Sequence, residues 1–89
     1  MKRLILPHWF GEVSNQEKIG FLVGYAATYA TPKGTITEMC EITRIAPATI
    51  QHGKKAGSFG EPVARRIELC VGRDVLHWEW LVNPDALLP

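Results

Sequence analysis

Apolar residues recur every three or four positions over most of the chain, which is the pattern of amphipathic helices packed on one core. Before the first such stripe, Ser14 and Glu17 have the spacing of a capping box, in which each side chain satisfies the other's free backbone amide. Five apolar residues form the stripe: Ile19, Leu22, Val23, Ala26 and Tyr29. Pro32 and Gly34 end it, so we expect the first helix to begin at Ser14 and to end before Pro32.

A second, shorter pattern has the same start signal. Thr35 and Glu38 form a second capping-box pair. One face of the following turns carries Ile36, Met39, Cys40 and Thr43. We expect a helix of about eight residues here, followed by Arg44 and a turn at Ile45 and Ala46.

The third pattern opens with Pro47, which suits a first helical position because its missing N–H would be unpaired there anyway. Ile50 and Gly53 share one face. The other side is polar or small and consists of Pro47, Ala48, Gln51, His52 and Lys55. A helix with so few apolar anchors gains little from burial. Its exposed face is therefore free for a ligand.

The remaining patterns complete an all-α fold of four or five short helices. Glu61-Pro62 starts a fourth helix, and Gly72 ends it. Its apolar stripe is Val63, Ile67, Cys70 and Val71. The last part, RDVLHWEWLVNPDALLP, alternates in a way that fits either a short terminal strand or a short helix over Leu76–Leu81.

The N-terminal arm, residues 1–13, follows no helical period. Leu4, Ile5 and Leu6 would fit a short strand that Pro7 stops. Trp9 and Phe10 are too apolar for a free tail, so we expect this segment to lie on the core or on a second subunit.

Composition places the chain among small globular proteins. Eighty-nine residues support one core, so residues 1–89 form a single domain, and 46% hydrophobic content argues against disorder. Cys40 and Cys70 lie in apolar helical patterns, as buried thiols in a reducing compartment do. The apolar run near Met1 is too short for a signal peptide, and no run approaches the length that spans a membrane. We therefore expect a cytoplasmic protein with no membrane partner.

Charge is unevenly distributed although the net charge is only +1. Residues 1–43 are neutral, residues 44–73 carry +4, and the tail from residue 74 carries −3. A basic middle favours an anionic partner.

Signatures of catalysis are absent from the sequence. His8, His52 and His77 are widely separated, and no cysteine or histidine pair has zinc-ligand spacing. The stretch GKKAGSFG lacks the spacing of a phosphate-binding loop. We expect no enzyme activity, no cofactor, no metal and no small-molecule substrate.

The segment Cys40–Gly53 resembles the helix-turn-helix of the Cro and phage-repressor family of DNA-binding proteins. That family has a small residue in its second helix, an apolar residue five positions on at the turn, and another five later. Those places hold Cys40, Ile45 and Ile50. The segment IAPATIQHG resembles the family's turn and recognition helix, and RRIELCVGRDVLHWEWLVNP is similar to its fourth helix and Leu-x-x-Pro end. The resemblance covers roughly residues 16–86.

Two positions depart from the family pattern. Arg44 stands where glycine is usual at the turn, so it must adopt a less favourable backbone conformation or a different turn. Gly53 stands where many relatives have tryptophan, which leaves a smaller anchor beneath the third helix.

The resemblance implies sequence-specific binding of double-stranded DNA by a phage or prophage transcriptional regulator that occupies an operator. The candidates for base contact are, by position, Pro47, Ala48, Gln51 and His52. Gln51 is the best of them, because its amide can pair in bidentate fashion with adenine. The candidates for phosphate contact are Thr35, Thr37, Arg44, Lys54 and Lys55.

One recognition helix contacts few base pairs, so a homodimer on a pseudo-palindromic operator is expected. Trp9, Trp78 and Trp80 exceed what one small core needs, so the C-terminal segment, residues 74–89, is the candidate dimer surface, with the N-terminal arm beside it. Two alternatives stay open. One is an antitoxin that uses the same motif for autorepression, and the other is a protein-interaction module on a degenerate helix-turn-helix fold.

Overall fold

The computed structural model describes residues 6–86. Five α-helices follow one another: α1 (Asn15–Ala30), α2 (Ile36–Thr43), α3 (Pro47–Ala56), α4 (Glu61–Val71) and α5 (Trp78–Val82). Short 3-10 turns, η1 (Phe10–Glu12) and η2 (Pro84–Ala86), precede and follow them. The all-α prediction is confirmed, and residues 6–86 contain no strand. The last segment is therefore helical, whereas Leu4 and Ile5 of the expected N-terminal strand lie outside the described residues.

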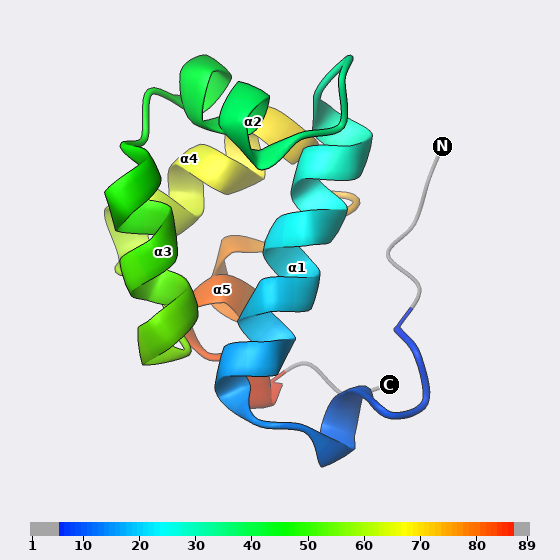
Figure 1. Cartoon of the computed structure of the whole chain (residues 1–89). Helices are drawn as coiled ribbons and strands as arrows, with labels where there is room; N and C mark the ends of the chain where they lie inside the picture. Colours follow the sequence, from blue (N-terminus) through cyan, green and yellow to red (C-terminus); the bar gives the residue numbers. More distant parts are fainter. Residues whose placement is uncertain (1–5, 87–89) are drawn as a thin grey trace.

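Helix α1 is the element on which the others pack. It contacts α2, α3 and α4, and α4 in turn contacts α5. In Figure 1, α2 lies across one end of α1, and α3 runs alongside α1. Helices α4 and α5 lie behind them. The core between them is made of fully buried apolar side chains, the largest being Phe10, Ile19, Leu22, Met39, Ile50, Ile67, Leu76 and Leu81.

The helix starts agree with the sequence in the bonds that Ser14 and Thr35 accept, but within residues 6–86 neither expected return bond from Glu17 or Glu38 forms. The Ser14 hydroxyl accepts a hydrogen bond from Glu17 N, and the Thr35 hydroxyl accepts one from Glu38 N, both at 3.2 Å. The return bond expected from Glu38 to the Thr35 amide is replaced, because the Glu38 carboxylate accepts from Lys33 N at 2.6 Å. This carboxylate therefore ties the turn before α2 to the helix.

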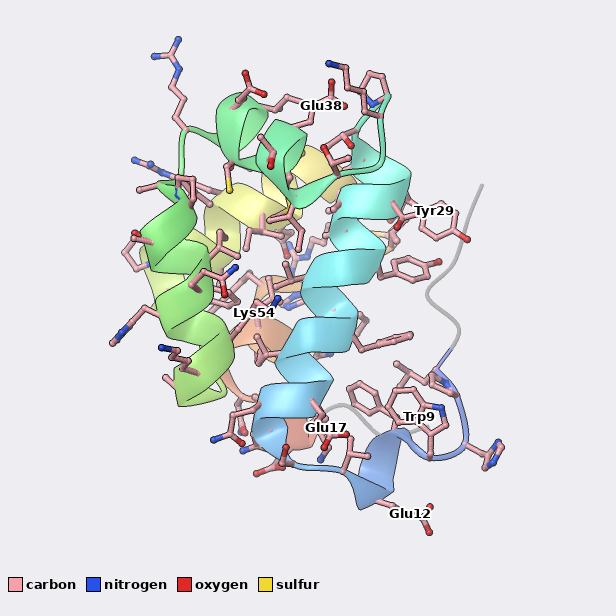
Figure 2. The ribbon with its side chains drawn as sticks, viewed as in Figure 1. Trp9, Glu12, Glu17, Tyr29, Glu38 and Lys54 are labelled. Atoms are coloured by element: carbon pink, nitrogen blue, oxygen red, sulfur yellow. The ribbon has the colours of Figure 1, made fainter. Side chains whose placement is uncertain are left out.

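The described part of the N-terminal segment, residues 6–13, lies on the core, which was one of its two expected positions. Phe10 is fully buried, and its ring lies 5.8 Å from that of Phe21 on α1. Trp9 packs edge-on against Phe21 at 5.7 Å and keeps 38% of its surface exposed. Figure 2 shows Trp9 beside the N-terminal half of α1. Lys18, almost buried, lies 5.7 Å from the Phe10 ring and pairs with Asp85 at 3.2 Å.

Helix α5 is held by side chains that the periodicity did not single out. The Glu68 carboxylate accepts from Trp78 N at 2.9 Å, and His77 Nδ1 accepts from Glu79 N at 3.2 Å. Trp78 and Trp80 are partly buried against the core. Both indoles thus contribute to the monomer's own packing, and the dimer surface stays a prediction.

Two further expectations concern the thiols and the membrane. Cys40 and Cys70 are free thiols; Cys40 is buried as expected, whereas Cys70 is only partly buried. Burial raises the pKa of each thiol, so both are neutral near pH 7. Among residues 6–86, no helix has the length and apolar character needed to cross a membrane.

Candidate nucleic-acid interface

The corner between α2 and α3 is made by three residues, Arg44, Ile45 and Ala46. Arg44 has φ 60° and ψ 34°, the left-handed conformation that favours glycine, and its N–H donates to the carbonyl of Cys40. Ile45 N donates to the same carbonyl at 3.2 Å, and the Ile45 side chain is buried. Of the two outcomes left open for Arg44, the less favourable conformation is the one observed, and the two hydrogen bonds and the buried Ile45 hold the turn in place.

Helix α3 is anchored by Ile50, by Gly53 and by an aromatic ring that the sequence pattern did not identify. The ring of Phe59 packs directly on Gly53, so that a Cβ there would overlap it and lie 2.7 Å from Cζ. Phe59 is 5% exposed, and its N–H donates to the carbonyl of Leu81 at 2.9 Å. The expectation of a small anchor is corrected: Phe59 fills the space that a larger residue at position 53 would occupy. An aromatic residue inside the glycine-rich AGSFG loop was the available signal.

The opposite face of α3 is open to solvent. Pro47, Ala48, Gln51 and His52 are all exposed, so the structure places the four candidates for base contact on one helix surface. Within residues 6–86, no hydrogen bond or ion pair engages the side chain of Gln51 or His52. Both polar groups are therefore available to a ligand.

The two lysines of α3 point in different directions. Lys55 is exposed, next to the face that carries Gln51 and His52. Lys54 follows Ile50 by one turn and is partly buried, on the side of α3 nearer α1 (Figure 2). Both lie in the last turn of α3, where a cation also favours the helix dipole. Lys55 is thus the more exposed of the two lysines beside the candidates for base contact.

The candidates on α2 lie at its two ends. Thr35 and Thr37 are exposed at the start, and the Thr35 hydroxyl is already used as a cap. Arg44 is exposed beyond the last residue, roughly 12 Å away by helical rise. Glu38 lies in the first turn, where its charge offsets part of the dipole that would attract phosphate. Arg44 is thus the stronger of the α2 candidates electrostatically.

The arginines of α4 differ in their contacts. Arg65 bonds to Glu61 at 2.8 Å and lies 4.5 Å from the Trp78 ring, so its charge is engaged within the fold. Arg66 Nη1 donates to the Arg44 carbonyl at 3.4 Å and stands beside the α2–α3 corner. Only Arg66 extends the basic surface of that corner.

The described residues contain no group of three or more histidine, cysteine or acidic side chains able to hold a metal ion. Comparison with protein-family models, with curated proteins and with solved structures gave no match to this chain.

Proposed function

We propose that this protein binds double-stranded DNA in a sequence-specific manner through α3, as a Cro-like regulator that occupies an operator in a phage or prophage. The observation that supports this best is the two-sided character of α3. One side is fixed by Ile50 and by the Phe59 ring on Gly53, while the other presents Gln51 and His52 to solvent. A helix held rigidly by one face and polar on the other suits insertion into the major groove.

In this proposal the first two turns of α3 face the base edges. The Gln51 amide pairs with adenine through one donor and one acceptor, and Ala48 contacts a thymine methyl group. His52, one residue further, donates to guanine or to phosphate.

Cations around this face hold the protein in register. Lys55 and Arg44 are exposed on either side of the base-contacting residues and contact phosphate, with Thr35 and Thr37 as hydroxyl donors at the start of α2. The net charge of +4 over residues 44–73 supports association with a polyanion.

A homodimer completes the proposal. Recognition helices of such dimers lie about 34–36 Å apart, one turn of DNA. The described part of the chain measures 31 × 30 × 19 Å, so two copies side by side can place their α3 helices at this spacing.

The test is selection of binding sites from a random duplex pool at low salt. Enrichment of a pseudo-palindromic site is expected, with weaker binding to every duplex in Lys55→Ala. Lys33→Ala, which removes an exposed lysine from the turn before α2, is the matched control and should bind normally. A pool without any enriched sequence would contradict the proposal.

A further inference from the structure

An open hollow of about 450 Å³ lies where the end of α2 meets α4. Its lining residues are Ile42, Thr43, Arg44, Arg66, Leu69 and Cys70. Ile42 is 50% exposed and Leu69 is 83% exposed. Leu69 lies away from the buried side of α4, where Ala64 and Ile67 are the buried residues.

Neither of these apolar side chains belongs to the core cluster, and the DNA proposal assigns a contact to neither. A single exposed leucine is ordinary, but two large aliphatic side chains around one depression indicate a site for another molecule. Phosphate groups gain nothing from aliphatic contact, so the DNA proposal leaves Leu69 and Ile42 unexplained.

The charge of the hollow is of one sign. Arg44 and Arg66 line it, and no acidic residue does. Within residues 6–86 neither guanidinium takes part in an ion pair, and Arg66 makes only its bond to the Arg44 carbonyl. Two guanidinium groups outside ion pairs favour carboxylates or phosphates, with which they form bidentate bonds. The aliphatic Ile42 and Leu69 in the same lining favour the carboxylates of a peptide.

We propose that this hollow binds a short segment of a partner protein in which leucine-type side chains are flanked by carboxylates. The apolar side chains would cover Ile42 and Leu69, and the carboxylates would pair with Arg44 and Arg66. A second copy of this chain fits less well, because a twofold interface brings the same patch from both subunits together, and its lining has no acidic residue to pair with Arg44 and Arg66. The site adds a protein partner to a surface beside the proposed DNA-contacting helix.

The probe is a synthetic 15-residue amphipathic peptide with leucines at helical spacing and glutamates elsewhere. Two matched peptides have the glutamates replaced by lysines, or the leucines by serines. Backbone amide shifts in NMR titrations of the full chain report where each peptide binds. Saturable binding of the acidic leucine peptide is expected, with shifts at the end of α2 and along α4, and neither matched peptide should saturate.

Two variants test the chemistry. Leu69→Ser removes the most exposed apolar side chain and should weaken peptide binding about tenfold. Arg66→Glu should abolish binding of the acidic peptide and allow the lysine peptide to bind. Gln51→Ala, on the other exposed surface, should bind the peptide normally. Thermal melts within a few degrees of the parent would show that these exposed positions leave the fold intact.

Leu69→Ser should bind selected duplex DNA as the parent does. The peptide-binding proposal and the DNA proposal can therefore fail independently of each other. The inference is overturned if the acidic peptide does not saturate, or if its shifts fall outside α2 and α4. It is overturned equally if Leu69→Ser weakens binding of selected duplex DNA, or if the parent is a dimer that Leu69→Ser converts to a monomer. Those two results would assign the hollow to DNA or to a second copy.

Discussion

The ring of Phe59 occupies the space that a side chain at position 53 would need, so Gly53 and Phe59 together anchor α3. Gly53 lies within α3, where glycine ordinarily costs stability relative to alanine. Here the absence of a side chain is what lets an aromatic ring from the following loop reach the helix. The orientation of the proposed recognition helix depends on this contact between residues six positions apart.

Gly53→Ala should therefore lower the free energy of unfolding, by about 1–3 kcal/mol, because a buried ring and the helix backbone would have to move apart. Urea denaturation gives the value. The matched control is Gly20→Ala in α1, where an added Cβ meets no atom within 4 Å. That variant should instead gain about 0.5–1 kcal/mol from helix propensity. Equal changes in the free energy of unfolding for the two substitutions would show that the contact between Phe59 and Gly53 does not contribute to stability.

Arg44→Gly should stabilise the fold by about 0.5–1 kcal/mol, because glycine adopts the left-handed conformation without steric cost. The same variant should bind duplex DNA more weakly if Arg44 contacts phosphate. Denaturation midpoints and DNA titrations of the one variant would thus move in opposite directions. Arg44→Lys keeps the charge and the strain and should resemble the parent in both assays.

For DNA binding, Gln51→Ala should cost about 1–3 kcal/mol on the selected site and relax preference at one base pair. Lys55→Ala should weaken specific and random duplexes alike and flatten the dependence of affinity on salt. Fluorescence anisotropy at several salt concentrations separates the two effects. An equal loss on specific and random DNA for Gln51→Ala would remove its assigned role in base recognition.

Stability should fall above about pH 9, because burial raises the pKa of the Cys40 and Cys70 thiols above their ordinary value of 9.0. As pH rises, the thiols of the unfolded chain lose their protons before those of the folded protein do. The contribution of the two thiols to the free energy of unfolding is therefore complete below pH 9 and decreases as the pH rises above 9. Urea denaturation at about pH 8 and pH 10 measures the change. A variant with Cys40→Ala and Cys70→Ala should lose less stability over this interval than the parent.

Tyr25 must be accounted for in that experiment. Burial and the neighbouring Tyr29 raise the pKa of its phenol as well, so it contributes with the same sign. Tyr25→Phe measures this contribution separately. An unchanged pH dependence in the double cysteine variant would assign the whole effect to other groups.

Much of the helical order follows from local sequence. The hydroxyls of Ser14 and Thr35 cap α1 and α2, Pro47 occupies the first turn of α3, and Gly72 follows the end of α4, all as expected. These signals lie within a few residues of the helix ends they mark, so the sequence alone contains them.

Contacts between distant residues were not predictable in this way. The carboxylate of Glu68 bonds to Trp78 N ten residues on, and Phe59 reaches Gly53 only because its loop is tied to Leu81. Helical periodicity assigns such residues to a face but not to a partner. The candidate site likewise has a part that local sequence predicts and a part that depends on contacts between distant residues. The exposed face of α3 was predictable, whereas the separation of Lys54 from Lys55 and the hollow at Leu69 required the packed helices.

Lys18 bonds to Asp85 and lies under the Phe10 ring, so one side chain of α1 joins both ends of the described chain. The bond closes a loop of 67 positions and has no equivalent in local helix formation. Contacts of such sequence separation make distant segments depend on one another. Release of either end would leave the almost buried ammonium group of Lys18 without its carboxylate or its aromatic cover, so the contacts of each end favour the ordered state of the other.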